Sequence, residues 1–263
     1  MTDSTTTKPK VRHLLGLSGG KDSSALAIYM RDKVPEIEYF FSDTGAELPE
    51  TLQFIDLLED YLGKPIVRLS AVKDFEWYLK LHNNFLPSPQ QRWCTVNLKL
   101  KPFEEFVGND EAVSYVAIRA DEPARAGYNS SSKQNINIRF PFREDNIGKS
   151  DVQEILANAG LGMPSYYEWR SRSGCYFCFF QRVDEWKGLK EKHPDLFEKA
   201  KQFEKTDPKT GKTYTWNQQG DLDEVVSKPR KNTLSCATVP NKKLLLEILG
   251  DEEDSDYCVP CHK

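Results

Sequence analysis

Short apolar segments alternate with longer amphipathic ones along the first half of the chain. Residues 11–17 (VRHLLGL) form an apolar run that ends at Ser-Gly-Gly, which predicts a buried strand, and residues 22–31 (DSSALAIYMR) predict a helix. The remaining elements expected here are strands at 36–41, 65–69 and 113–118 and a helix at 49–62. Strands that alternate with helices are typical of a twisted parallel sheet flanked by helices. We therefore predict a Rossmann-like α/β fold, which binds ligands beyond the carboxyl ends of its strands.

The character of the sequence changes near residue 150. Cysteines, aromatic residues and charged helical stretches then dominate, and Asp151 is expected to be the N-cap of a helix at 151–158. The organisation predicted from this change is a flexible tail at 1–10, an α/β domain at 11–150 and a mostly helical, cysteine-containing region at 151–263.

Composition limits the classes of protein and the compartment. With 38% hydrophobic and 29% charged residues, the chain is expected to be globular, and its net charge of −4 argues against a protein that coats nucleic acid in bulk. It contains no run of roughly 18 uncharged apolar residues, and its polar start lacks the core of a signal peptide. We therefore expect a cytoplasmic protein without a membrane partner. In that reducing compartment the six cysteines are better explained by metal, cluster or redox chemistry than by disulfides.

A glycine-rich hexapeptide, SGGKDS, connects the first predicted strand to the first predicted helix. It comprises Ser18, Gly19, Gly20, Lys21, Asp22 and Ser23. Paired glycines allow the backbone to approach an anion, and the helix that follows presents its positive end. Lys21 adds a cation, the serines add hydroxyl donors, and Asp22 is a candidate ligand for Mg²⁺. An ordinary strand-to-helix turn is the alternative, but the complete hexapeptide favours phosphate binding, although it is not the Walker pattern.

Further polar residues follow other predicted strands. Asp43 and Thr44 come after the second strand, where a carboxylate suits a ribose or metal-bound water, although such a turn is common in α/β proteins. Arg119 and Arg125 follow the fourth strand and are candidates for neutralising phosphate, the alternative being a solvated charged loop.

The segment RWCTVNLKLKP contributes another cluster. Lys99 and Lys101 are candidates for binding pyrophosphate or a nucleic-acid backbone, although two lysines are usually solvent-facing. Trp93, beside Arg92 and Cys94, is the tryptophan that we single out as a candidate outside the core.

The cysteines form two CxxC pairs and two single residues, namely Cys175 with Cys178, Cys258 with Cys261, Cys94 and Cys236. A CxxC pair directs two sulfurs toward one metal, so two pairs could complete a zinc site, whereas an iron–sulfur cluster needs three or four thiolates. Cys236 could also be a small buried residue, and the pair near the C-terminus could be a redox pair.

Several motifs together resemble one family. The hexapeptide, FFSDTGAELPET, RWCTVNLKLKP, AIRADEPAR and RSGCYFCFFQRVDEW resemble the PP-loop adenine nucleotide α-hydrolase superfamily, in the branch of phosphoadenosine phosphosulfate reductases and Dnd/Ssp-type DNA phosphorothioation enzymes. The resemblance is greatest to the phosphorothioation enzymes and covers residues 14 to about 200. It implies an ATP pyrophosphatase that adenylates an acceptor for sulfur transfer, with DNA as the acceptor and with ATP and Mg²⁺ as cofactors. It also implies a cysteine desulfurase and other phosphorothioation or phage-defence proteins as partners.

The resemblance also assigns residues. Lys21, Asp22, Cys94 and Arg119 are expected to be catalytic, and the hexapeptide, Asp43, Thr44 and Arg125 are expected to bind the nucleotide. The resemblance maps Cys94, Cys175 and Cys178 as ligands of an iron–sulfur cluster, or alternatively of zinc. It does not map the fourth ligand, for which we take Cys236, with Cys258 and Cys261 as alternatives.

Three other functions stay open at this stage. A phosphoadenosine phosphosulfate reductase is one, although the chain ends in CVPCHK rather than in the Glu-Cys-Gly-x-His tail of those enzymes. A tRNA thiolation enzyme is another. The third is a non-catalytic nucleotide-sensing module, against which the intact hexapeptide argues.

Overall fold

The computed structural model describes residues 11–125, 134–206, 211, 213–217 and 219–228. Within them lies a five-stranded sheet with the order β3-β2-β1-β4-β5, in which every neighbouring pair is parallel. The strands are β1 (Arg12–Leu17), β2 (Glu38–Asp43), β3 (Ile66–Ser70), β4 (Ala112–Tyr115) and β5 (Ile136–Arg139). The predicted α/β fold with a parallel sheet is therefore confirmed. The strand order reverses between β1 and β4, since the chain adds β2 and β3 on one side of β1 and β4 and β5 on the other, and this switch point is where such sheets bind ligands.

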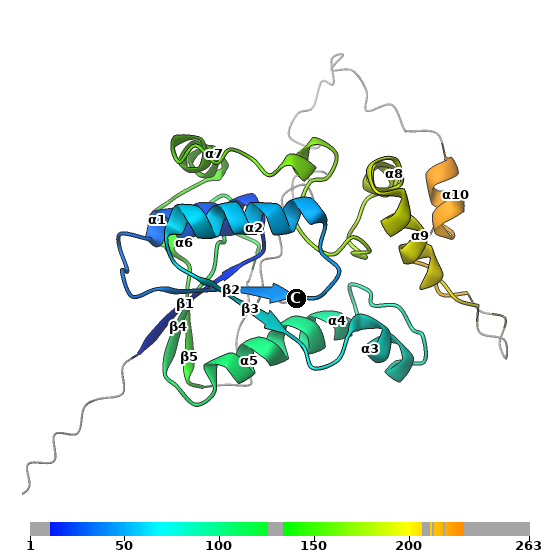
Figure 1. The fold of residues 1–263 in the computed structure, drawn as a ribbon, viewed down its shortest axis with the longest axis horizontal. Coiled ribbons are helices and arrows are strands. Elements are labelled where there is room, and N and C mark those ends of the chain that lie inside the picture. Colours follow the sequence, from blue (N-terminus) through cyan, green and yellow to red (C-terminus); the bar gives the residue numbers. More distant parts are fainter. Residues whose placement is uncertain (1–10, 126–133, 207–210, 212, 218, 229–263) are drawn as a thin grey trace, which may run out of the picture.

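Helices cover both faces of the sheet (Figure 1). The α-helices are α1 (Lys21–Met30), α2 (Pro49–Leu62), α3 (Phe75–Leu81), α4 (Trp93–Thr95), α5 (Lys101–Val107), α6 (Pro141–Glu144), α7 (Lys149–Asn158), α8 (Val183–Lys192), α9 (Pro194–Gln202) and α10 (Leu222–Ser227). A π-helix, η1 (Val96–Leu100), joins α4 to α5, and a 3₁₀ helix, η2 (Ser165–Glu168), follows α7. Helices α1, α2 and α7 lie on one face and α5 on the other, while α8, α9 and α10 form a group beyond the ends of β2 and β3 (Figure 1).

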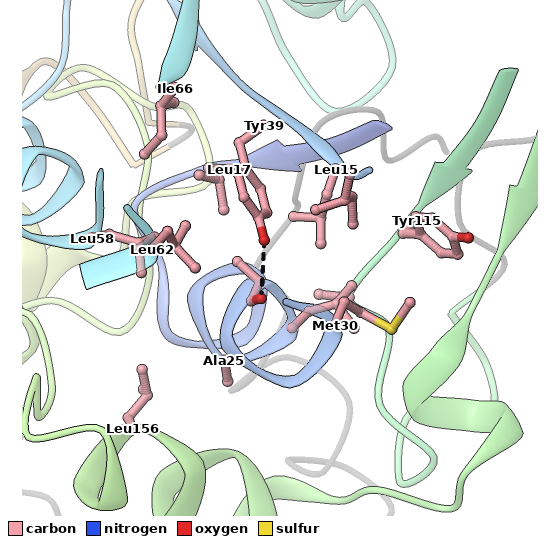
Figure 2. Packing of buried hydrophobic residues seen from close by; sticks show 14 of the residues in the cluster. Leu15, Leu17, Ala25, Met30, Tyr39, Leu58, Leu62, Ile66, Tyr115 and Leu156 are labelled. Carbon is pink, nitrogen blue, oxygen red and sulfur yellow. Dashed lines mark hydrogen bonds between the residues drawn. The ribbon is translucent and has the colours of Figure 1, made fainter. Parts of the chain in front are cut away.

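The first core lies between the sheet and the helices of one face. Helix α1 packs between β1 and α7, so that Ala25 and Ala27 are fully buried and their small side chains let the neighbouring elements approach closely. Figure 2 shows Leu15 and Leu17 of β1 around this helix, and the Tyr39 hydroxyl donates to the Ala27 carbonyl oxygen at 3.4 Å. Each fully buried leucine of this kind contributes about 1.5–3 kcal/mol to folding.

A second core is aromatic and joins the helical region to earlier segments. Phe75 lies against Phe177, with ring centroids 4.2 Å apart, and Trp216 stacks on Phe177 at 5.3 Å. Trp93 stacks on Phe75 at 5.1 Å and is buried, so its proposed role outside the core is wrong. This core contains residues from both sides of position 150, where we predicted a domain boundary. The division of the chain into two domains stays a prediction.

Most element predictions are confirmed, with some differences at the ends. The predicted helix at 49–62 matches α2, which ends at Gly63 in a left-handed conformation. Gly148, not Asp151, is the N-cap of α7; Asp151 lies within the first turn, where its carboxylate accepts a hydrogen bond from the Gly148 amide at 2.8 Å. Strand β5 was not predicted. None of the helices within the described residues is long and apolar enough to cross a membrane.

Candidate functional site

The glycine loop, residues 18–23, connects β1 to α1 at the carboxyl edge of the sheet. The Ser23 hydroxyl accepts from the Ser18 amide at 3.1 Å and donates to the Gly20 carbonyl oxygen at 3.2 Å. The Ser18 hydroxyl accepts from the Gly20 amide at 3.2 Å. These bonds hold the loop in one shape, with the N-terminus of α1 directly behind it. The N-terminus of a helix attracts anions.

Glycine is required at both central positions of this loop. Gly19 has φ = +73°, which disfavours other residues, and a Cβ atom there would lie 2.6 Å from the Thr51 side chain of α2. A Cβ atom on Gly20 would lie 2.8 Å from the Ser173 hydroxyl oxygen. The loop is therefore packed closely between α2 and the segment that carries the CxxC pair.

Two tyrosines of η2 contact the glycine loop. The Tyr166 hydroxyl donates to the Gly19 carbonyl oxygen at 2.8 Å, and the Lys21 amide donates to the Tyr167 hydroxyl at 3.2 Å. The Lys21 ammonium also lies 5.4 Å from the centre of the Tyr167 ring. Sequence reasoning missed both tyrosines, because nothing in the pattern SYYE indicates contact with a loop 146 residues earlier.

Buried charges connect the glycine loop to the segment after β4. Asp22 accepts from the Arg119 guanidinium at 3.0 Å and lies 3.2 Å from the Lys21 ammonium. The three side chains are only 1–3% exposed, so removing one of these charges would leave a buried charge without its partner. Lys21, Asp22 and Arg119, all expected to be catalytic, are thus brought together at the switch point between β1 and β4. In this arrangement two cations engage the Asp22 carboxylate that was expected to hold Mg²⁺.

Arg119 also organises the loop that follows it. Its side chain donates to Asp121 at 2.9 Å, and its amide donates to Glu122 at 3.1 Å. Glu122 in turn binds Arg125 at 2.9 Å. Burial by itself would lower the pKa of Arg119, but Asp22 and Glu122 outweigh burial and raise it above the ordinary value, so the guanidinium stays charged.

Asp43 and Thr44 lie at the end of β2, as predicted. The Asp43 carboxylate accepts from the Gly45 amide at 2.9 Å. The Thr44 hydroxyl donates to Glu47 at 2.6 Å and lies 3.2 Å from the Cys175 sulfur. Burial raises the pKa of Glu47, although Lys99 and the Thr44 hydroxyl act in the opposite direction. Thr44 thus connects the end of β2 to the cysteines.

Cys94, Cys175 and Cys178 line one cavity of about 80 Å³, which we call the cysteine cavity. Cys94 comes from α4, and the other two come from the loop before α8. The cavity also contains Thr44 and Lys99, and its wall includes Ser173, whose hydroxyl donates to the Ser18 hydroxyl at 3.1 Å. The segment that carries the cysteines is therefore in direct contact with the glycine loop.

Lys99 reaches this cavity from the π-helix η1. Cys94 lies in the short helix α4 directly before η1, and both side chains line the cavity. Burial would lower the pKa of Lys99, but Cys175 and Glu47 outweigh it and raise the pKa.

Arg170 and Glu185 hold the CxxC loop in place. The Arg170 guanidinium donates to the carbonyl oxygens of Gly174 at 3.0 Å and Cys175 at 2.7 Å. Glu185 accepts from the Ser171 hydroxyl at 2.6 Å. Burial would raise the pKa of Glu185, but Arg170 and these hydrogen bonds outweigh it and lower the pKa. Both residues are buried and were missed from the sequence, because their partners are carbonyls and hydroxyls without a motif.

Burial favours the protonated form of the Cys94 and Cys175 thiols. Burial raises the pKa of Cys94 to about 12 and that of Cys175 to about 11. Lys99 acts in the opposite direction on both. A nearby positive charge, such as a bound metal ion, would be needed to convert these thiols to thiolates.

The donor set suits a soft metal or an iron–sulfur cluster, since three thiols from two segments line one cavity. Within the described part of the chain, however, no group of three or more His, Cys, Asp or Glu side chains is gathered closely enough to hold a metal ion. Cys236, Cys258 and Cys261, the candidates for the fourth ligand, lie outside the described residues.

Two arginines lie at the wall of the same cavity. The guanidinium groups of Arg92 and Arg172 lie 4.8 Å and 4.7 Å from the centre of the Phe180 ring. Stacked guanidinium groups keep their charge and their planar donors, which suits them to bind phosphate or sulfate. Lys101 donates to Asn97 at 2.7 Å and is absent from the cavity wall.

A larger cavity of about 550 Å³ lies beside the cysteine cavity at the ends of β2 and β3. Asp43 and Trp77 line it, and Thr44 and Leu98 line both cavities. Trp77 is 43% exposed, in contrast to Trp93. The nucleotide-binding candidates after β2 therefore adjoin an open cavity and the cysteines at once.

Comparison with known proteins finds similarity to one domain family and to proteins described as uncharacterized. The model of the phosphoadenosine phosphosulfate reductase domain matches residues 12–141. An uncharacterized protein of Methanocaldococcus jannaschii is 27% identical over 199 residues, which are 71% of this chain and 40% of that protein. An uncharacterized 37.8 kDa protein of Escherichia phage 186 is 25% identical over 269 residues, with 78% of each chain covered.

Two further comparisons concern the lengths of the relatives and a solved structure. The chain covers less than half the length of two archaeal relatives, at 40% and 45%. A crystal structure of phosphoadenylyl-sulfate reductase from Candida auris in complex with phosphate aligns with a TM-score of 0.48 and 14% identity, covering 66% of this chain and 85% of that one.

Proposed function

Since this chain contains a domain of the phosphoadenosine phosphosulfate reductase family, we propose that it splits ATP into AMP and pyrophosphate to activate an acceptor for sulfur transfer. The observation that carries the proposal is the position of Lys21 and Arg119. Both buried cations lie beside the glycine loop, at the switch point where a parallel sheet binds its ligands.

In this proposal the glycine loop holds the β- and γ-phosphates of ATP. The N-terminus of α1 and the Lys21 ammonium neutralise their charge, and Asp22 keeps Lys21 and Arg119 in position. Mg²⁺ would bind together with the phosphates. The Asp22 carboxylate, which already pairs with Lys21 and Arg119, positions these two side chains rather than acting as the first metal ligand. Tyr167 lies where a phosphate oxygen would meet the Lys21 amide, so its hydroxyl would move aside or donate to that oxygen.

The chemistry then has two displacements. An acceptor phosphate oxygen attacks the α-phosphorus of ATP, the bond to the β-phosphate oxygen breaks, and pyrophosphate leaves with the electron pair. Hydrosulfide then attacks the acceptor phosphorus, AMP leaves, and the sulfur loses its proton, so that one oxygen is replaced by sulfur. A cysteine desulfurase with a thiol reductant would supply the hydrosulfide. The protein contributes mainly positioning and charge neutralisation.

The cysteine cavity is the site proposed for the sulfur step. Cys94, Cys175 and Cys178 would hold an iron–sulfur cluster, or alternatively zinc, and such a centre supplies a position where sulfide can bind. Lys99 favours the thiolate form of Cys94 and Cys175. The contact between Ser173 and Ser18 would connect this cavity to the nucleotide.

DNA is the proposed acceptor, through the resemblance to the phosphorothioation enzymes. Arg92 and Arg172 at the cavity wall would hold the backbone phosphate while the sulfur is introduced. Other phosphorothioation or defence proteins would be the partners of this enzyme.

Release of pyrophosphate from ATP tests the proposal. With single-stranded DNA as the acceptor and hydrosulfide present, we expect equal amounts of AMP and pyrophosphate from the wild-type protein, and a decrease of at least about 100-fold in Lys21→Ala, because a buried cation beside the phosphates is lost. Lys192→Ala, which removes an exposed lysine of α8, is the matched control and should keep the wild-type rate. Formation of ADP instead of AMP, or an unchanged rate in Lys21→Ala, would contradict the proposal.

A second candidate function is reduction of phosphoadenosine phosphosulfate, which the family match favours. It would use a cysteine thiolate to attack the sulfur of the substrate, followed by reduction by a dithiol protein. Turnover of phosphoadenosine phosphosulfate with thioredoxin, without cleavage of ATP, would support this candidate over the first.

A further inference from the structure

A third hollow, of about 450 Å³, shares none of its lining residues with the cavity lined by Asp43. We call it the neutral groove. One wall is formed by residues 85–90 and the other by residues 213–217 and 219, with Phe179 between them. None of the described residues that line it carries a charged side chain.

Aromatic rings and carboxamides share the lining of the neutral groove. Phe85 and Tyr214 meet edge to face, with ring centroids 5.3 Å apart. The carboxamide oxygen of Asn217 accepts from the Gln219 amide at 2.9 Å, which fixes that side chain in place. The exposed Gln90 lies on the facing wall. Flat rings for stacking beside uncharged groups that both donate and accept hydrogen bonds are what a protein uses to bind an unpaired nucleobase.

The neutral groove adjoins the cysteine cavity directly. Pro87 and Phe179 line both hollows. Positive charge stands on both sides of the groove: Arg92 and Arg172 lie at the cysteine cavity, and the Lys228 ammonium donates to the Gln219 carbonyl oxygen at 2.8 Å. A single-stranded nucleic acid that places a base in the neutral groove would therefore have cations beside its phosphates.

From this arrangement we infer that the neutral groove binds a nucleobase of a single-stranded nucleic acid, so that the phosphate next to that base lies at the cysteine cavity. The inference deepens the proposed function and rests on it for the identity of the acceptor. It assigns the choice of nucleotide to Gln90, Asn217 and Gln219, because carboxamides distinguish bases by their edges.

Binding of two labelled strands to the full-length protein tests the inference. One is a fluorescent single-stranded deoxyoligonucleotide of about 12 nucleotides, and the other has the same length and charge but no bases. Fluorescence anisotropy at one fixed salt concentration should show the strand with bases bound about tenfold more tightly, because stacking on aromatic rings is lost without bases. The double variant Gln90→Ala/Gln219→Ala should lose most of this preference, and Gln153→Ala, which changes an exposed glutamine on α7, should keep it.

Each other outcome overturns the inference. Equal binding of both oligonucleotides would show that the protein contacts only their phosphates. Absence of binding would show that the protein does not bind a single-stranded nucleic acid. A preference that persists in the double variant would place the base elsewhere. Pyrophosphate release, measured on the same preparations with a saturating amount of the strand without bases as the phosphate acceptor, reports separately on the proposed function, so normal ATP cleavage without a base preference would reject the groove assignment alone.

Discussion

The glycine loop and the cysteine cavity meet at Ser18 and Ser173, yet they differ in how they are built. The glycine loop is one hexapeptide whose serines and glycines bond to one another, and its buried Asp22 pairs with Lys21 of the loop and with the distant Arg119. The cysteine cavity takes its thiols from two segments about 80 residues apart, and its wall also includes Thr44 at the end of β2.

The difference has an energetic consequence. In the glycine loop, buried charges and a tight backbone serve both stability and the proposed chemistry, so most changes should affect both. In the cysteine cavity burial favours the neutral form of Cys94 and Cys175, so removing either thiol leaves no unpaired charge. We therefore expect the first region to be fragile and the second to be tolerant toward substitution, as far as folding is concerned.

Removal of Arg119 should give the largest effect. Arg119→Ala leaves the buried Asp22 with one cation fewer, and loss of one partner of a buried ion pair costs about 3–5 kcal/mol of the free energy of unfolding. Arg31→Ala removes a comparable pair with Asp32 at the surface and should cost less than about 1 kcal/mol. Urea denaturation of both variants checks this prediction. Equal losses would show that burial of the network contributes nothing.

Substitution of Gly19 should have an intermediate effect. Gly19 and Gly63 both have positive φ angles, of +73° and +62°, but only at Gly19 would a Cβ atom meet a neighbour, Thr51 at 2.6 Å. Gly63→Ala should therefore cost about 1 kcal/mol from backbone strain, and Gly19→Ala about 3 kcal/mol from strain and overpacking together. Thermal and urea unfolding give both values. Similar costs would mean that the contact with α2 relaxes easily and that the loop is less tightly packed than we describe.

Substitution in the cysteine cavity should have the smallest effect at neutral pH, and its effect should depend on pH. Because the pKa of Cys94 is raised to about 12 in the folded protein, its protonated form contributes stability below the pKa of the unfolded thiol, near 9. This stability is lost as the pH rises from about 9 toward 12. The free energy of unfolding of the wild type should thus fall between pH 9 and 10 by about 1 kcal/mol more than that of Cys94→Ala.

Urea unfolding of both proteins, each free of bound metal, at pH 7, 8, 9 and 10 measures this difference, with pH 7 to 8 as the internal control interval in which the two should change nearly in parallel. Parallel curves up to pH 10 would show that the thiol is exposed to water in the folded protein. The comparison between a charged and a neutral buried site would then no longer hold.

The sequence predicted the elements where periodicity and glycine signals were strong. The strand at 11–17, the helix at 49–62 and the hexapeptide between strand and helix were recognised because each is encoded within a few neighbouring residues. Strand β5 was missed because it has only four residues and one buried side chain. The N-cap of α7 was misassigned because Asp suits both the N-cap and the first turn, and only the backbone distinguishes them.

The sequence by itself determined that a parallel α/β sheet would place SGGKDS and the residues after β2 and β4 along one edge, because parallel strands end on the same side. Only the tertiary structure decided that Arg119 neutralises Asp22, that Tyr166 and Tyr167 contact the glycine loop, and that Lys99 of the π-helix lines one cavity with the cysteines. Such pairs join residues 5 to 147 positions apart, and their partners are chosen by packing and burial. A local sequence pattern does not show which residues come into contact in the folded chain, so only the structure could reveal these pairs.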